Sequence, residues 1–390
     1  MIARPLLALV AKDLRVFAAD RNALVLSFLA PIALASFMAA IFGGAGKSQS
    51  SPIPILVADE DRGVISRAIV AGVLADGQVA AVAAGRDAAL ASVRRGESSL
   101  AVVIPAGFGA AAARTLAGGE SPPELLLVHD PARRGDAALV RGVLARVVLD
   151  AVASGDLGGR GPFGLAPRAA GPPFEVRDAS IVPGGADGER AALATHAFAG
   201  MVVQFVLFSA IEWGVGLLLE RERGLWKRLR TAPVGRATLL AGKVLGCLVA
   251  SLAIVGAVFG FGALAFGLRP RGGLAGFLLV AVGFAWMAAN FGLMVAAFGR
   301  SPRGARSISI LAVLVMVMLG GGWIPGFLFP AWLLRLTPAI PTRWAIDGFY
   351  GSLARGLTAA EVAPAAAALV GFGAAFGALA LAAFRRSEPA

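Results

Sequence analysis

The chain has 390 residues, of which 57% are hydrophobic and only 15% charged, and its formal net charge is +12. Soluble domains average about 45–50% apolar and about 25% charged residues, so this composition argues against a soluble enzyme and for an integral membrane protein. The single cysteine, Cys247, excludes an intrachain disulfide and a cysteine-cluster metal site, and two histidines leave little material for a zinc site.

Six stretches are long and apolar enough to cross a bilayer, which requires about 20 consecutive apolar residues. They are residues 23–44, 197–219, 244–267, 274–298, 307–328 and 362–384. The first is too long for the apolar core of a signal peptide, so we expect a retained anchor. The sequence therefore predicts an α-helical polytopic membrane protein with six transmembrane helices.

The N-terminal segment 5–19 predicts an amphipathic helix. Its apolar side chains recur at helical spacing, at Leu6, Val10, Leu14 and Phe17. Lys12 and Arg15 lie off this stripe, as expected of a helix that rests on the inner membrane surface. A frayed tail is the alternative. With the first span, this helix forms the predicted region 1–44.

Residues 45–196 form a second predicted region, an inserted α/β domain. Strand-like runs alternate with helix-like runs, at 53–58, 63–74, 78–83, 87–95, 100–104, 107–116, 124–128 and 136–152. This alternation is typical of a mainly parallel sheet covered by helices. Residues 155–190 are rich in glycine, proline and arginine, so we expect a linker that returns to the membrane. We expect the His129-Asp130 pair to lie on the surface.

The distribution of charge predicts the orientation. The segments that lie inside if the N-terminus is cytoplasmic carry sixteen lysines and arginines and five acids, at 1–22, 220–243, 299–306 and 385–390. The inserted region has a net charge of −1. The positive-inside rule therefore places both termini in the cytoplasm and residues 45–196 outside. Because topology accounts for the basic excess, we expect no binding to nucleic acid.

Segment 220–243 carries the strongest local pattern. Two acids and a glycine precede an amphipathic turn, a proline break and a second short helix. The positive-inside rule explains its arginines but not its apolar faces, which suit docking into a groove on a cytoplasmic partner. The candidate coupling residues are Glu220, Glu222, Gly224, Leu225, Trp226, Arg228, Leu229 and Pro233.

Two polar residues within the predicted spans are candidates for a role in transport. Glu212 is an intramembrane acid, and such acids are candidates for a transport pathway or a gate. Pairing with a neighbouring helix is the alternative for Glu212. Asn290 is a second, weaker candidate for the pathway or gate.

No pattern in the chain indicates an enzyme. The sequence shows no paired carboxylates, no Ser/His/Asp arrangement and no metal-binding spacing. The GGAGKS run at 43–48 resembles the end of a phosphate-binding loop, but Ile41 stands where the full pattern needs glycine. We therefore expect no catalytic, cofactor-binding or metal-binding residues.

With these residues in view, the chain resembles the permease subunits of ABC-2 type ABC exporters. More narrowly, it resembles the branch with a large extracytoplasmic domain between the first two transmembrane helices. The motifs that carry the resemblance run in order along the chain: the start of the first span, Asp59-Glu60-Asp61, Ile104–Phe108, His129-Asp130, Glu220–Pro233, Gly242-Lys243 and the broken hairpin at 323–346. One departure is Leu225-Trp226, where the family often has a small polar residue and an acid.

The resemblance implies the remaining expectations. This chain would be a transporter subunit in the bacterial cytoplasmic membrane, and a separate cytoplasmic ATPase would bind ATP and magnesium. A second permease chain, identical or a sister, would complete the transporter, a periplasmic adaptor protein is a further candidate partner, and membrane lipid would surround the spans. Residues 197–390 would form the main transmembrane domain of five helices. The apolar spans suit a hydrophobic or amphiphilic substrate, whether drug-like, lipid-like or peptide.

Two other classes of function are alternatives for this sequence. A secondary transporter would need internal repeats and buried ionisable groups near the midplane, and six spans with one acid and no visible repeat argue against it. A membrane-anchored sensor would use the outer domain as a ligand-binding module. The lack of any cytoplasmic signalling domain in the sequence argues against the sensor.

Overall fold

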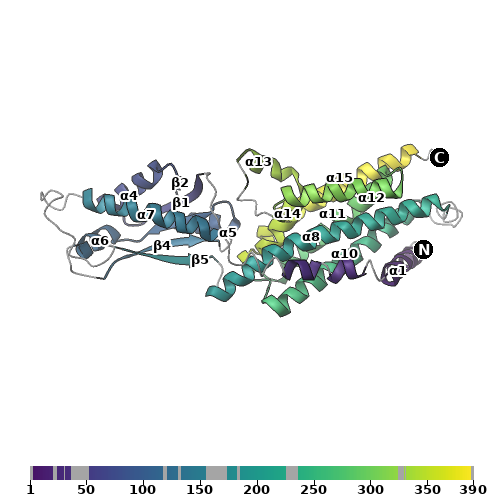
Figure 1. Ribbon diagram of the computed structural model, residues 1–390, viewed down its shortest axis with the longest axis horizontal. Coiled ribbons are helices and arrows are strands. Elements are labelled where there is room, and N and C mark those ends of the chain that lie inside the picture. The colour runs from purple at the N-terminus through teal and green to yellow at the C-terminus, as the bar shows by residue number, and fades with distance from the viewer. Residues whose placement is uncertain are drawn as a thin grey trace. The chain divides into compact units, whose positions relative to one another are not determined.

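The computed structural model in Figure 1 describes most of the chain. The described residues are 3–20, 24–29, 31–36, 52–116, 121–130, 133–154, 174–181, 185–224, 236–323, 329 and 331–387. They fall into two compact units. The helical unit comprises Met1–Gly43 and Arg190–Ala390, and the sheet unit comprises Gly44–Glu189.

The sheet unit is built around five strands in the order β2-β1-β3-β4-β5. In chain order they are β1 Ile53–Asp59, β2 Val79–Ala83, β3 Leu100–Ile104, β4 Glu124–His129 and β5 Glu175–Ser180. The helices between them are α4 Val64–Ala75, α5 Arg86–Arg95, α6 Phe108–Leu116 and α7 Arg134–Ser154. All five residues of β3 are buried, which is typical of a central strand with helices on both faces of its sheet.

The two faces of the sheet carry separate apolar clusters, because successive side chains of a strand point to opposite sides. Leu100 and Val102 of β3 join the larger cluster, to which α4, α6 and α7 contribute. Ala101 joins a smaller cluster with Val93 of α5. The alternating pattern seen in the sequence thus corresponds to real strands and helices.

The sheet is mainly parallel, as expected, and one feature of it departs from expectation. The region 155–190 was predicted to be only a linker, yet Glu175–Ser180 within it forms the edge strand β5, parallel to β4. Its sequence, EVRDAS, has no apolar run, so only pairing with β4 reveals the strand. Charged residues are common on edge strands, where they discourage pairing with other chains. The pairing of β3 with β4 is antiparallel, and the other three pairings are parallel.

The helical unit consists of long helices and several short pieces. Its elements are α1 Ala3–Ala19, η1 Val25–Leu29, α8 Gly185–Glu222, α10 Arg236–Phe266, α11 Leu274–Phe298, α12 Pro302–Leu319, α13 Ala331–Leu336, η4 Thr337–Ala339, α14 Pro341–Tyr350, η5 Gly351–Arg355 and α15 Ala359–Ser387. The first residues of α8, up to Glu189, belong to the sheet unit. Figure 1 shows α8, α11, α12 and α15 running beside one another within the helical unit.

Five helices among the described residues are long and apolar enough to cross a membrane. They are Arg190–Glu222, Ala237–Phe266, Leu274–Phe298, Pro302–Leu319 and Ala359–Arg386. These correspond to the second to sixth predicted spans. Of the first predicted span, 23–44, the structure describes residues 24–29 and 31–36, and the rest of the span lies outside the described residues.

The fifth span ends earlier than the sequence suggested. α12 stops at Leu319, whereas the apolar run continues to residue 328. Three consecutive glycines, 320–322, follow the helix, and Gly321 has a φ of 85°. That left-handed conformation is easily adopted only by glycine, so it stops the helix despite the apolar residues that follow.

Glycines allow the helices of this unit to pack closely. A Cβ atom on Gly214 of α8 would clash with the carbonyl oxygen of Gly292 in α11. A Cβ atom on Gly373 of α15 would lie 2.5 Å from Cδ1 of Trp286 in α11. Small residues at such crossings are the usual means of helix association in membranes.

The amphipathic helix predicted at 5–19 is present as α1. Its apolar stripe contacts the protein itself: the rings of Phe17 and Trp213 have centroids 6.1 Å apart, and a Cβ atom on Gly242 would lie 3.7 Å from Cδ1 of Leu6. Leu7 and Val16 face outward, exposed by 67% and 63%. The stripe therefore serves to attach α1 to the bundle.

Candidate coupling site

The predicted coupling residues are only partly covered by the structure. Leu225, Trp226, Arg228, Leu229 and Pro233 lie outside the described residues. Of the remaining three candidates, Glu220 and Glu222 form the last turn of α8, and Gly224 follows it with a φ of 72°. A glycine in this conformation just past a helix is a common C-terminal stop.

Glu220 belongs to a group of four charged residues, which we call the four-charge cluster. Its members are Lys12, Asp13, Glu220 and Lys243. Nζ of Lys243 lies 2.9 Å from Oδ1 of Asp13 and 2.8 Å from Oε2 of Glu220. Nζ of Lys12 lies 2.9 Å from Oε1 of Glu220 and 3.1 Å from Oδ1 of Asp13. The cluster thus joins α1, α8 and α10.

The inner members of the cluster are shielded from solvent. The side chain of Asp13 is 6% exposed, that of Lys243 13% and that of Glu220 18%. Buried charges are costly unless they are paired, so each of these residues depends on the others. Partial burial alone would lower the pKa of Lys12, but hydrogen bonding to Glu220 and the charge of Asp13 raise the pKa above its ordinary value of 10.5.

The position of the cluster follows from the packing of α1 on α10. Gly242 and Gly246 leave room on α10, where added Cβ atoms would meet Leu9 of α1 and the ring of Trp213. Asp13 lies 3.7 Å from the site of the Cβ on Gly246. A larger residue at Gly242 would crowd Leu9 of α1, and one at Gly246 would crowd the ring of Trp213 on α8.

Sequence reasoning singled out Glu220 and the Gly242-Lys243 pair but missed the role of Asp13. A signal was available, because a helical projection places Asp13 beside Val10 and Phe17, on the apolar stripe of α1. An acid on an apolar face needs a partner. The identity of that partner, Lys243, cannot be deduced from helical spacing.

Glu212 is paired with a neighbouring helix, the alternative considered from the sequence. Arg306 of α12 donates from Nε to Oε1 of Glu212 at 2.7 Å and from Nη2 to Oε2 at 2.5 Å. The two side chains remain 49% and 44% exposed within the chain. This bidentate pair links α8 to α12 at a point where both side chains remain about half exposed.

Asn290 lies at a different helix contact. It is 4% exposed, and its Nδ2 donates to the carbonyl oxygen of Trp286, 2.9 Å away on the same helix. A Cβ atom on Gly377 of α15 would lie 2.5 Å from its Oδ1. The residue therefore faces the contact between α11 and α15, away from the Glu212–Arg306 pair on α8 and α12.

The broken hairpin predicted at 323–346 contains a polar contact that the sequence did not suggest. Nε1 of Trp323 donates to Oε1 of Gln204 in α8 at 2.6 Å, and Gln204 is 7% exposed. Residues 324–328 and 330 lie outside the described part of the hairpin. Beyond them, α13, η4 and α14 form short consecutive helices, as a broken hairpin requires.

Two motifs of the sheet unit meet at one loop. The carboxylate of Asp61 accepts from the backbone N–H of Gly107 at 2.6 Å and of Gly109 at 3.2 Å, at the start of α6. It occupies the position where a helix N-terminus could hold a phosphate.

The expectation that His129 and Asp130 form a surface pair was wrong, because they are only 5% and 4% exposed.

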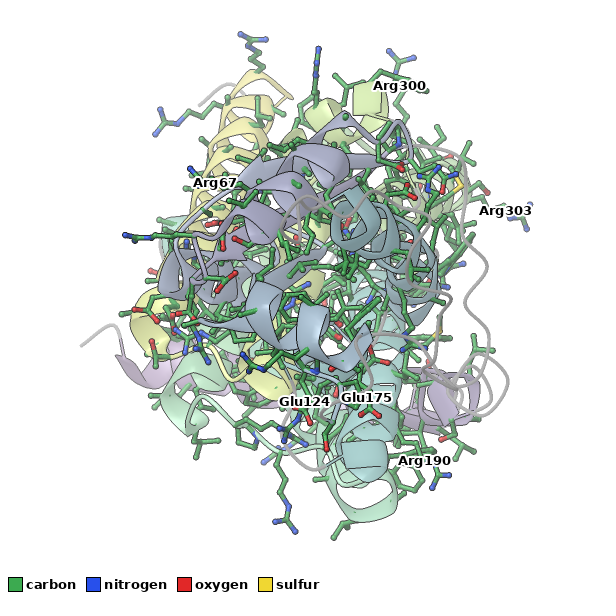
Figure 2. The ribbon with its side chains drawn as sticks, turned by 90° about the vertical axis from the view of Figure 1, so that its left-hand side faces the viewer. Arg67, Glu124, Glu175, Arg190, Arg300 and Arg303 are labelled. Atoms are coloured by element: carbon green, nitrogen blue, oxygen red, sulfur yellow. The ribbon has the colours of Figure 1, made fainter. Side chains whose placement is uncertain are left out.

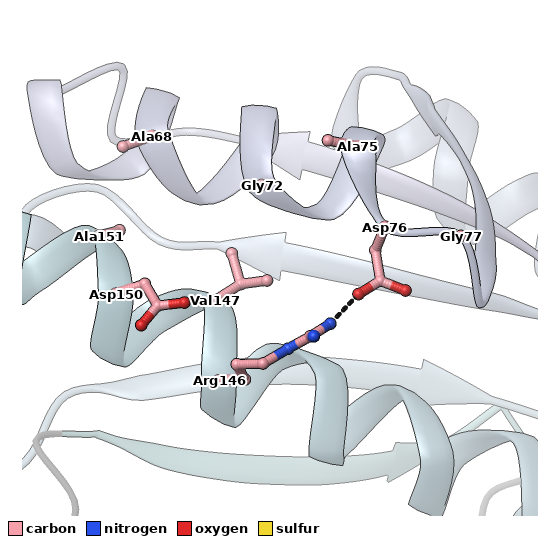
Figure 3. Close-up of a pocket in the computed structure, with 9 residues that line it drawn as sticks. All are labelled: Ala68, Gly72, Ala75, Asp76, Gly77, Arg146, Val147, Asp150 and Ala151. Carbon is pink, nitrogen blue, oxygen red and sulfur yellow. Dashed lines mark hydrogen bonds and ion pairs between the residues drawn. The ribbon is translucent and has the colours of Figure 1, made fainter.

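The sheet unit also contains a cavity of about 490 Å³ between α4 and α7. Figure 3 shows the pair of Arg146 and Asp76 across it, with small residues such as Gly72 along α4. Asp76 also accepts from the N–H of Gln78 at 2.8 Å, so its carboxylate is already used by the fold. Among the described residues, no group of three or more metal-ligating side chains is present here or elsewhere.

Comparison with protein families settles the class of this chain. Residues 21–382 match the family described as ABC-2 family transporter protein. The chain belongs to the ABC-2 transporter family. The match covers the apolar helices of the helical unit and the sheet unit alike, so this ABC-2 protein is a multi-pass membrane protein and a permease.

A characterised permease is similar to this ABC-2 chain. The linearmycin resistance permease protein LnrN of Bacillus subtilis (strain 168) is 26% identical over 194 residues. The aligned region covers 48% of this chain and 49% of LnrN, so the chain spans about half the length of the curated relative it matches. Within the ABC-2 family, association with an ABC ATPase subunit is expected of a permease.

Proposed function

We propose that this chain is the permease of an ATP-driven exporter, which moves a hydrophobic or amphiphilic substrate out across the bacterial cytoplasmic membrane. ATP and magnesium bind to a separate cytoplasmic ATPase. Membership in the ABC-2 family supports this proposal, and so does a relative named for resistance to a compound. Both termini lie in the cytoplasm and the sheet unit lies outside, as the charge distribution favours.

The observation that carries the coupling mechanism is the four-charge cluster. Glu220 and Lys243 stand on either side of residues 225–235, and a 2.8 Å ion pair joins them. A partner that binds this segment therefore acts on α8 and α10 together. Asp13 extends the connection to α1, so three elements respond to one docking event.

The docking step itself rests on the apolar residues of the segment. Leu225, Trp226 and Leu229 are spaced to form one face of a short helix. Buried aromatic and aliphatic anchors of this kind contribute about 2 kcal/mol or more at interface hot spots. Glu222, Arg228 and neighbouring charges set orientation and the rate of encounter more than affinity.

Glu212 and Arg306 are proposed to gate the pathway. Their pair connects α8 to α12, and only 22% of the residues of α12 are buried within this chain. An element with so few contacts can move at low cost. The exposed face of α12 is available to lipid or to a second permease chain, which the family arrangement implies. Separation of the pair would free two charged side chains between two helices that are otherwise mostly apolar.

The test is reconstitution of the permease with its cognate ABC ATPase. Leu229→Asp and Trp226→Ala are each expected to reduce substrate-stimulated ATP hydrolysis at least about tenfold, because an anchor is lost or a charge enters the interface. Arg228→Gln serves as the matched control and is expected to have a smaller effect. Normal stimulation of Leu229→Asp, at unchanged expression, would contradict coupling through this segment.

A further inference from the structure

We propose that the far end of the helical unit binds the phosphate groups of anionic phospholipids. The surface, which we call the distal rim, consists of residues 267–273 and 331–355. It lies at the end of α10 opposite to Lys243, and the N–H of Gly272 joins its two segments by donating to the carbonyl oxygen of Ser352 at 3.3 Å. This inference goes beyond export and needs no ATPase partner.

The distal rim is strongly basic. It carries one acid, Asp347, and five arginines, Arg269, Arg271, Arg335, Arg343 and Arg355. Asp347 forms an ion pair with Arg343, in which Nε of Arg343 lies 3.3 Å from Oδ2 of Asp347. Arg269 and Arg335 are exposed, and within the described part of the chain neither forms a hydrogen bond or an ion pair. The segments at the Lys243 end already satisfy the positive-inside rule, so topology does not require these arginines.

Apolar side chains stand beside these arginines on α13. Trp332, Leu334 and Leu336 are exposed by 65%, 38% and 58%, and Arg335 lies among them. Tryptophan and leucine beside arginine are typical of segments at the membrane interface, where the rings lie at headgroup level and the guanidinium reaches phosphate. The arrangement of apolar side chains around Arg335 on α13 thus fits the boundary of a bilayer.

The rim is held in this arrangement by hydrogen bonds from α14. Arg343 contacts Oγ1 of Thr337 and donates to the carbonyl oxygen of Leu334 at 3.5 Å. Nε1 of Trp344 donates to the carbonyl oxygen of Pro338 at 2.8 Å. These hydrogen bonds fix both ends of the turn between α13 and α14. They therefore hold the exposed face of α13 in a defined position.

Charge complementarity favours lipid over the protein's own sheet unit as the occupant. Residues 45–196 have a net charge of −1. The acids of the sheet unit that form ion pairs with its own arginines are Glu60, Asp76, Glu97, Glu124, Asp136 and Asp178. A layer of phosphodiester groups, in contrast, offers many anions, and guanidinium binds phosphate through two parallel hydrogen bonds.

The first test identifies what covers α13 in the native membrane. A photo-reactive benzoylphenylalanine is introduced at Leu336, cells are irradiated, and the adduct on the purified full chain is weighed by mass spectrometry. A phospholipid adduct is expected. Cross-links confined to protein, whether to the sheet unit or to a second copy, would overturn the proposal.

The second test measures the charge requirement. The purified full chain is exchanged into mixed phosphatidylglycerol and phosphatidylcholine, and retained lipid is counted. We expect the double variant Arg269→Gln, Arg335→Gln to retain about fivefold less phosphatidylglycerol, with phosphatidylcholine unchanged. Arg177→Gln, at an exposed ion pair of the sheet unit, is the matched control. The double variant Arg269→Lys, Arg335→Lys should restore binding of phosphatidylglycerol. Unchanged retention of phosphatidylglycerol in the double glutamine variant would refute the inference.

Discussion

Lys243 and Asp13 are 230 residues apart in the sequence, yet Nζ of Lys243 lies 2.9 Å from Oδ1 of Asp13. The same ammonium group reaches Glu220 at the end of α8. A buried ion pair adds little net stability compared with an apolar pair, but it is costly to break and specific in geometry. Its contribution here is positional: it sets α1 against the two helices that flank residues 225–235.

Removal of the central lysine should therefore be strongly destabilising. Lys243→Ala leaves Asp13 and Glu220 buried with only Lys12 to neutralise them, and we expect it to lower the free energy of unfolding by about 3–5 kcal/mol. Arg15→Ala, on the exposed side of α1, should change it by less than about 0.5 kcal/mol. Thermal unfolding of the purified protein measures both.

The cluster also makes a prediction about pairs of changes. Asp13→Leu together with Lys243→Leu removes both charges and should be less destabilising than Lys243→Ala alone, because no buried charge is left unpaired. Unfolding temperatures that fall additively in the double variant would show that the two residues act independently.

The pairing of the edge strand β5 with β4 leads to a prediction about which fragment of the chain forms a stable sheet unit. A fragment of residues 52–154 lacks β5, which pairs with β4 from Glu124 to His129. A fragment of residues 52–181 includes it. We expect the longer fragment to unfold cooperatively at a clearly higher temperature, as followed by circular dichroism. Identical melting of the two fragments would mean that β5 contributes nothing outside the full chain.

The Glu212–Arg306 pair separates a structural role from a gating role. Both side chains are roughly half exposed, so Glu212→Gln should change stability by less than about 1 kcal/mol. If the pair gates the pathway, transport should fall far more than stability. The exchanged variant Glu212→Arg, Arg306→Glu should recover part of the transport rate. Wild-type transport in Glu212→Gln would remove the gate from the mechanism.

Cysteine labelling tests the proposed orientation. The one native cysteine, Cys247, is buried, so background labelling should be low. In intact cells a membrane-impermeant maleimide should label a cysteine introduced at Gly118 and not one at Arg300. Figure 2 shows Arg300 and Arg303 extending away from the protein, so a lack of labelling at Arg300 would reflect its side of the membrane. The reverse pattern would invert the topology.

Much of the architecture follows from local patterns in the sequence. Uninterrupted apolar runs predict the helices α8, α10, α11, α12 and α15, because a bilayer demands length and apolarity and little else. The apolar residues 100–104 predict a strand, and the structure shows that this strand is buried at the centre of the sheet. The order of motifs along the chain was enough to indicate the ABC-2 family, which the match over residues 21–382 confirms.

Other features depend on contacts between distant residues and had no local signal. The strand β5 is polar and exists through hydrogen bonds to β4, so its sequence resembles a linker. The charge of Glu212 is visible in the sequence, but its partner Arg306 lies 94 residues away on another helix.

The sequence by itself determined which segments are apolar, which are charged, and where glycines end a helix or allow two helices to pack closely. Only the tertiary structure decided that Asp13, Glu220 and Lys243 meet, and that the apolar stripe of α1 is used for attachment to α10 and Trp213. The physical reason is that hydrophobicity and turn formation are properties of short segments. Ion pairs and close helix crossings depend instead on the relative placement of whole elements.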